Sequence, residues 1–76
     1  MPFVQIKVIE GALTAELKKE MIERVAEVVA EIESRPNPKE TLLPYVWVQI
    51  DEMKPENFGV GGVQMTPERI DFLTKK

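Results

Sequence analysis

Residues 2–11 read PFVQIKVIEG, and their pattern indicates the first element of the fold. Every second position at its centre holds an apolar β-branched residue, namely Val4, Ile6 and Val8. This period of two predicts a β-strand over residues 3–9. Phe3 and Ile9 place apolar groups on the opposite face as well, so we expect both faces of the strand to be covered.

A long amphipathic helix is predicted over residues 15–34. Its apolar residues recur at spacings of three and four, and they are Leu17, Met21, Val25, Val28 and Ile32. Thr14 is suited to cap the N-terminus of this helix. The outer face includes Glu23, Glu27 and Glu31, a repulsive ladder that we interpret as a solvated surface rather than a cation site.

A second alternating stretch, YVWVQIDEM, occupies residues 45–53 and predicts another strand. The prolines of residues 35–38 end the helix before it. Two strands joined by a helix form a βαβ unit, in which the strands are parallel. The glycine-rich residues 57–65 predict a short hairpin, and residues 66–68 (Thr-Pro-Glu) predict the start of a last helical turn. The expected fold class is α/β, with one parallel βαβ unit and a short C-terminal hairpin in a single domain over residues 1–76.

Composition narrows the classes of function. The chain has 76 residues with no Cys and no His, which excludes disulfides, serine–histidine chemistry, redox thiols and zinc sites. It has 10 Lys and Arg against 13 Asp and Glu, and no basic cluster favours a nucleic-acid partner. No apolar run is long enough to span a membrane, and we expect a cytoplasmic protein. So small a domain needs a further source of stability, and self-association is the one left to this chain.

Pro2 is the main candidate for chemistry. If Met1 is removed, Pro2 carries a free secondary amine, and an α-amino group has a reference pKa of about 7.7–8.0. Burial in an apolar pocket lowers such a pKa, so that a neutral amine can remove a proton next to a carbonyl at neutral pH. While Met1 stays attached, the nitrogen of Pro2 is a tertiary amide and cannot act as a base.

Two other motifs are better explained by structure than by chemistry. Residues 59–62, Gly-Val-Gly-Gly, lead into a strand rather than opening a helix, so a turn is favoured over a phosphate-binding loop. Asp51 and Glu52 are adjacent on a strand and point to opposite faces. We therefore interpret them as an ordinary strand end rather than an acid–base pair.

In order and spacing, these segments resemble the 4-oxalocrotonate tautomerase family. The resemblance rests on the opening Pro, a strand ending in Glu10-Gly11, a downstream Glu52-Met53, and FGVGG at residues 58–62. It implies a β-α-β subunit that assembles as a homo-oligomer, a hexamer built as a trimer of dimers. It also implies proton transfer without cofactor or metal on a small-molecule enol or 2-oxo acid, with Pro2 as the general base and Phe58 lining the pocket.

Two substrate-binding arginines of the family are replaced in this chain. Ala12 (or Leu13, because the loop has one extra residue) and Trp47 occupy these positions. Neither side chain provides the bidentate, charged clamp that Arg offers a carboxylate. Trp47 either packs in a subunit interface or lines the substrate pocket. The candidates for a replacement cation, from this or a neighbouring chain, are Arg35, Lys39 and Lys7.

The leading hypothesis is therefore an isomerase, a keto–enol tautomerase acting on a substrate less dianionic than the family's usual diacid. The alternative is a non-catalytic subunit of the same fold that serves oligomerisation or binding, because both arginine positions are replaced and a retained Met1 blocks Pro2. A third hypothesis, in which a cationic Pro2 protonates an intermediate as in dehalogenase relatives, ranks last because those relatives also use the missing arginines.

Overall fold

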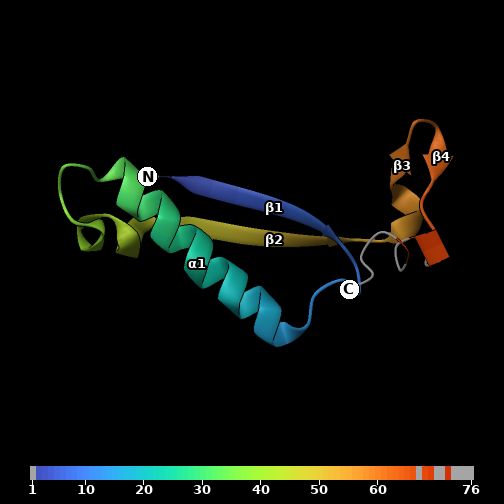
Figure 1. Ribbon diagram of the computed structural model, residues 1–76, viewed down its shortest axis with the longest axis horizontal. Coiled ribbons are helices and arrows are strands. Elements are labelled where there is room, and N and C mark those ends of the chain that lie inside the picture. The colour runs from blue at the N-terminus through green and yellow to red at the C-terminus, as the bar shows by residue number, and fades with distance from the viewer. Residues whose placement is uncertain (1, 67, 70–71, 73–76) are drawn as a thin grey trace.

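Two strands, β1 (Phe3–Ile9) and β2 (Trp47–Met53), form a parallel sheet in the computed structural model, which describes residues 2–66, 68, 69 and 72. Their register runs from Phe3 opposite Trp47 to Ile9 opposite Met53. The helix α1 (Ala15–Glu33) connects the two strands and lies against the sheet (Figure 1). The predicted βαβ unit with parallel strands is confirmed.

One face of the sheet is covered by α1 and the other is open. Residues on the covered face are half-buried, and they are Val4, Ile6, Val8, Val48 and Ile50. Glu52 continues this face of β2 and forms an ion pair with Lys18 of α1. On the other face Phe3 and Trp47 are each 58% exposed. The second face, which we expected to be covered, is therefore bare in a single protomer.

The ends of α1 follow from its capping residues. The hydroxyl of Thr14 accepts a hydrogen bond from the backbone N–H of Leu17 at 3.2 Å, as predicted for an N-cap. At the other end the backbone N–H of Ser34 donates to the carbonyl of Ala30 at 3.0 Å. The Ser34 hydroxyl donates to the carbonyl of Asn37 at 3.1 Å, which turns the chain away from the helix axis.

The acidic ladder on α1 is exposed, but it is not a row of unpaired charges. Each of its three carboxylates has a cation within ion-pair distance: Glu23 with Lys19 at 3.7 Å, Glu27 with Lys39 at 3.1 Å, and Glu31 with Arg35 at 3.7 Å. The side chains of Glu23, Glu27 and Glu31 are all well exposed, which agrees with the interpretation of this face as solvated. The predicted repulsion is offset because the cations of the helix and of the following connection approach the same face.

β2 begins two residues later than predicted. Leu43–Tyr45 form a 3₁₀ turn that contains Pro44. The backbone N–H of Tyr45 donates to the Leu42 carbonyl at 2.8 Å, and that of Val46 donates to the Leu43 carbonyl at 3.2 Å. These local bonds use the donors that a strand would offer to β1, so alternation alone placed the start of the strand too early.

The predicted hairpin is confirmed. β3 (Gly59–Val60) and β4 (Val63–Gln64) pair antiparallel, with Val60 opposite Val63. The two loop residues, Gly61 and Gly62, have φ of 61° and 82°, and a two-residue hairpin turn of this kind needs positive φ at both positions. Beyond the hairpin, the hydroxyl of Thr66 accepts from the Arg69 N–H at 3.2 Å, as expected of an N-cap. Glu68, Arg69 and Phe72 are helical, as predicted, and the remaining residues after Thr66, including Ile70 and Leu73, lie outside the described residues.

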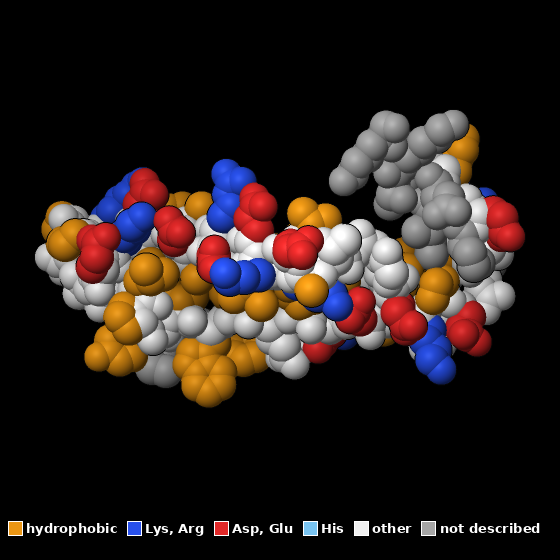
Figure 2. All heavy atoms as spheres, turned by 90° about the horizontal axis from the view of Figure 1, so that it is seen from below, with side chains coloured by type: hydrophobic (Ala, Val, Ile, Leu, Met, Phe, Trp, Pro, Cys, Tyr) orange, Lys and Arg blue, Asp and Glu red, His pale blue; other side chains and the backbone are white. Residues whose placement is uncertain are grey.

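Very little of a single protomer is buried. Among the described residues only Ala30, Ser34 and Met65 are classed as buried, and none of the large side chains is fully enclosed. The Cα radius of gyration is 15.6 Å, against about 11 Å for a compact chain of this length. The molecule extends 45 × 25 × 17 Å, and hydrophobic side chains gather along one side of its surface (Figure 2).

Candidate active site

Pro2 lies directly beside Trp47 at the start of the sheet. The Pro2 carbonyl accepts a hydrogen bond from the Trp47 backbone N–H at 3.0 Å. Because Phe3 is opposite Trp47 in the register, their side chains share the open face. Their ring centroids are 6.2 Å apart, with the planes tilted by 32°, which is within the range of favourable aromatic pairs.

An open hollow adjoins this aromatic pair. Its volume is about 590 Å³, and its lining residues are Phe3, Ile22, Val46, Trp47, Val48 and Gln49. Most of these side chains are apolar, and Gln49 adds a polar amide group to the lining. In one protomer Trp47 therefore lies on an open surface next to Pro2. Both predicted roles, packing in a subunit interface and lining the substrate pocket, stay predictions.

Phe58 lies at the opposite end of the sheet from Pro2. It follows β2 and the 3₁₀ turn Pro55–Asn57, and its carbonyl accepts from the Met65 N–H at 2.9 Å, which fixes the hairpin against it. The two parallel strands are seven residues long and separate the two ends by about 20 Å. Figure 1 shows the N-terminus at one end of the sheet and the hairpin at the other. One protomer therefore does not bring Pro2 and Phe58 together.

The loop between β1 and α1 lies at the Phe58 end. The backbone N–H of Ala12 donates to the carbonyl of Ile9 at 3.1 Å, which holds the loop close to the end of β1. Ala12 is exposed and Leu13 is half-buried. The two positions where the family resemblance leads us to expect arginine, Ala12 (or Leu13) and Trp47, are thus also at opposite ends of one protomer.

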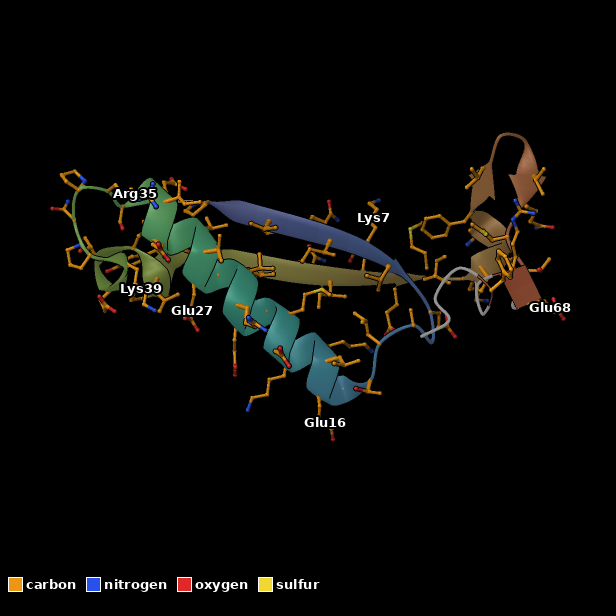
Figure 3. All side chains as sticks on the ribbon, viewed as in Figure 1. Lys7, Glu16, Glu27, Arg35, Lys39 and Glu68 are labelled. Atoms are coloured by element: carbon orange, nitrogen blue, oxygen red, sulfur yellow. The ribbon has the colours of Figure 1, made fainter. Side chains whose placement is uncertain are left out.

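Two of the three candidate cations already have carboxylate partners. Arg35 is 3.7 Å from Glu31 and Lys39 is 3.1 Å from Glu27. The hydrogen bond to Glu27 raises the pKa of Lys39 above its usual value. Both cations lie near the C-terminal end of α1, close to the start of β1 (Figure 3). Both pairs are exposed, and such pairs contribute little to stability, so either cation would exchange its partner for another carboxylate at small cost.

The third candidate, Lys7, is on the open face of the sheet. It is opposite Asp51 in the register and has no ion pair with any other described residue. The Asp51 carboxylate accepts hydrogen bonds from the amides of Gln5 and Gln49, the latter at 3.1 Å. Lys7 is further along β1 than Pro2 (Figure 3), so it does not face the aromatic hollow.

The sequence reading missed an ionic contact at the Phe58 end. The Nζ of Lys18 is 2.6 Å from Oε1 of Glu52, and both side chains are about one-third exposed. The hydrogen bond from Lys18 lowers the pKa of Glu52, and the backbone N–H of Gly11 lowers it further. Glu52 therefore joins β2, the β1–α1 loop and the helix. The sequence feature that could have predicted this ion pair is the position of Glu52 on the helix-covered face of β2, where a carboxylate needs a partner.

Within the part of the chain that the structure describes, no three His, Cys, Asp or Glu side chains are grouped so as to hold a metal ion. Among the same residues, no helix combines the length and apolar character that crossing a membrane requires.

A parallel βαβ unit followed by a glycine hairpin is the subunit fold of the tautomerases. The chain belongs to the tautomerase family, because the family model described as "Tautomerase enzyme" matches residues 2–67. The match begins at Pro2 and extends through the hairpin.

Individual relatives agree with this assignment. The chain is 36% identical over 69 residues to probable tautomerase K2 of Dickeya dadantii (strain 3937), covering 91% of this chain and 94% of that protein. It is 40% identical over 63 residues to a 2-hydroxymuconate tautomerase of Pseudomonas putida, with 83% and 89% covered. A heterohexamer 4-oxalocrotonate tautomerase structure from Chloroflexus aurantiacus J-10-fl matches with a TM-score of 0.72 and 28% identity, over 86% of this chain and 94% of that chain. Family membership supports a tautomerase-type isomerase activity.

Proposed function

We propose that the protein is a cofactor-independent keto–enol tautomerase in which Pro2, freed by removal of Met1, is the general base for a small enol or 2-oxo acid. The observation that carries this proposal is the position of Pro2. It precedes β1 directly, is half-buried, and is held by the backbone of Trp47 beside an open, mainly apolar hollow. Apolar surroundings favour the neutral form of an amine, which is the form that accepts a proton.

The reaction needs one group that takes up and returns a proton. The lone pair of the Pro2 nitrogen removes the proton from the carbon next to the substrate carbonyl, and the electrons of that C–H bond form the C=C bond of an enolate. The ring nitrogen then gives the same proton back, to oxygen to yield the enol or to another carbon to yield the isomer. The reverse sequence converts enol to ketone, and no oxidant or reductant is required.

We further propose that the working form is a homo-oligomer, with a hexamer built as a trimer of dimers as the expected assembly. A single protomer leaves Phe3 and Trp47 exposed, encloses no large side chain among the described residues, and has an open sheet face and free strand edges. Phe58 lines the same pocket as Pro2 only if it comes from another protomer. The lack of Cys fits the cytoplasm, where we place the protein.

The test combines processing with activity. Intact mass must first establish that Met1 is absent, since an acylated Pro2 cannot act. The processed protein is expected to accelerate ketonisation of a simple enol such as phenylenolpyruvate. Pro2→Ala is expected to lower kcat by about 10²-fold or more, the range of general acid–base contributions. A processed wild type without activity, or a Pro2→Ala variant that keeps full activity, would contradict the proposal.

A further inference from the structure

One ion pair connects the helix to the sheet, at the end of the protomer that carries Phe58. The Nζ of Lys18 in α1 is 2.6 Å from Oε1 of Glu52 in β2, and the two side chains are 32% and 34% exposed. The other ion pairs among the described residues lie within α1 or join it to the connection that follows, and their side chains are 38–80% exposed. The Lys18–Glu52 pair is therefore the one that solvent screens least.

This pair lies beside the last paired residues of the two-stranded sheet. Ile9 and Met53 are the last residues in register, and the Glu10 N–H donates to the Met53 carbonyl at 2.8 Å just beyond them. A sheet of two strands is only marginally stable by itself, so its ends open readily unless another contact holds them. The ion pair holds the end of β2 against α1, one residue before Met53.

The loop between β1 and α1 is held at the same place. The hydrogen bond from Lys18 and then the backbone N–H of Gly11 lower the pKa of Glu52, so the carboxylate lies between the helix and the loop. Gly11 has a φ of 89°, a conformation that Gly adopts without steric cost. The Glu52 carboxylate therefore joins three segments, namely the end of β2, the loop and the beginning of α1.

Phe58 is carried by this same end of β2. Lys54 and the 3₁₀ turn Pro55–Asn57 separate it from the strand. The turn is closed by its own backbone, because the Asn57 N–H donates to the Lys54 carbonyl at 2.9 Å and the Phe58 N–H to the Pro55 carbonyl at 3.0 Å. Figure 1 shows the hairpin beyond the end of the sheet and away from α1. Because the connecting turn is short and internally bonded, a displacement of the end of β2 is passed on to Phe58.

From these contacts we infer that Lys18 and Glu52 are positioning residues for the active site, because their ion pair fixes the end of β2 and thereby sets where Phe58 lies in the pocket. Neither side chain needs to touch the substrate. A pocket residue that is displaced by about 1 Å can lower the rate by up to about 10²-fold. The inference deepens the proposed function and rests on it for the meeting of Phe58 with Pro2 of another protomer.

Two neighbouring lysines provide matched variants. Lys18→Met removes the charge and keeps an aliphatic side chain, and it is expected to lower kcat/KM for phenylenolpyruvate by about 10-fold in the processed protein. Lys18→Arg keeps the charged hydrogen bond and is expected to stay within about 3-fold of the wild type. Lys19→Met is the control, because Lys19 is 80% exposed and 3.7 Å from Glu23, and it should stay within about 2-fold. Equal losses in Lys18→Met and Lys19→Met would overturn the inference.

A double-mutant cycle with Phe58 separates positioning from a general loss of folded protein. If the ion pair acts through Phe58, Lys18→Met should lower kcat/KM by about 10-fold in the wild-type background but by less than about 2-fold in Phe58→Ala. Unfolding of part of the sample would lower the activity by the same factor in both backgrounds, and that result would overturn the inference. Glu52→Gln removes the other partner and should give the same pattern, so the test holds even if Lys18→Met does not assemble. Light scattering ensures that only assemblies of the wild-type mass are compared.

The outcomes also separate this inference from the proposed function. If Pro2→Ala keeps full activity while the Lys18→Met loss depends on Phe58, the general-base proposal fails and the positioning role stands. If turnover depends on Pro2 but the Lys18→Met loss is the same with and without Phe58, the positioning role fails and the general base stands. A processed wild type without activity would overturn both.

Discussion

At the scale of single residues, Trp47 is the most informative position of the candidate site. Its backbone holds Pro2 through a 3.0 Å hydrogen bond, and its ring pairs with Phe3. The family resemblance expects an arginine there, and the indole supplies one neutral donor in its place. We therefore expect the side chain to change what the proposed pocket recognises, while the backbone contact to Pro2 does not depend on the identity of the side chain.

Restoring the charge at this position is expected to shift the substrate preference. Trp47→Arg should raise kcat/KM for 2-hydroxymuconate by about 10-fold or more relative to phenylenolpyruvate, because a charged hydrogen bond contributes about 1.5–3 kcal/mol. Tyr45→Arg adds the same charge outside the hollow and should leave the ratio of the two substrates unchanged. Steady-state kinetics with both substrates measure this ratio of kcat/KM in the wild type and in each variant. A diacid rate equal to the aryl rate in the wild type would mean that another cation already fills the role.

Glu52 gives a second prediction at this scale, in the pH dependence of stability. Because Lys18 and the Gly11 N–H lower its pKa below the ordinary value of 4.5, the folded state binds the proton of Glu52 less readily than the unfolded state does. Its stabilising contribution is therefore fully present above that ordinary value and is lost as the pH falls through the lower, folded-state pKa.

Glu52→Gln is accordingly expected to lower the midpoint of thermal unfolding near neutral pH, with a difference from the wild type that shrinks as the solution becomes acidic. Glu23→Gln is the matched control, since Glu23 and Lys19 are 3.7 Å apart and well exposed, and such pairs contribute little. Unfolding must be followed at one fixed protomer concentration. A difference between wild type and Glu52→Gln that stays constant with pH would contradict the assignment.

At the scale of elements, local sequence rules were sufficient where an element is stabilised by its own residues. The period of two in β1, the Thr14 cap of α1 and the paired glycines of the hairpin each predicted what the structure contains. The start of β2 was misplaced because Pro44 and the carbonyls of Leu42 and Leu43 form a local turn that competes with the strand.

Contacts between elements could not be predicted from the sequence. Lys18 and Glu52 are 34 positions apart, and no local pattern specifies that they meet. The contact between Pro2 and Trp47 depends on the register of two parallel strands, which is set by how a helix and a long connection pack rather than by alternation. The candidate residues could therefore be named individually from sequence, but their separation into two ends of the protomer could not.

The hairpin turn carries the prediction at this scale. Gly62→Ala is expected to destabilise the protein by about 1–2 kcal/mol, because φ is 82° there and nothing lies within 4 Å of an added Cβ, so the cost is the left-handed backbone itself. Gly59→Ala is the control. Its added Cβ would meet the Val63 carbonyl oxygen at an ordinary 3.7 Å, and its effect should stay within about 0.5 kcal/mol. Denaturant unfolding at equal protomer concentration compares the two, and equal losses would show that φ is not the cause.

At the scale of the whole molecule, the protomer is too open to account for its own stability. It encloses no large side chain among the described residues, and it leaves Val28, Ile32, Phe3 and Trp47 more than half exposed. A chain of 76 residues that buries so little apolar surface does not offset the entropy of ordering its backbone. Folding and assembly are therefore expected to be coupled, and the mass in solution should be several times 8.7 kDa, with six chains expected.

Because Pro2 and Phe58 lie at opposite ends of one protomer, the expected oligomer can be tested by asking whether one pocket contains residues from two protomers. If one pocket takes Pro2 from one protomer and Phe58 from another, then Pro2→Ala and Phe58→Ala assemblies are each impaired at every site. When the two variants are unfolded, mixed in equal amounts and refolded together, about a quarter of the pockets receive both native residues by random association. Activity should therefore rise to about a quarter of the wild-type value, although neither parent approaches it. Light scattering before and after mixing controls for a change in assembly. Mixed assemblies of the correct mass that show only the average of their parents would mean that no pocket combines Pro2 of one protomer with Phe58 of another.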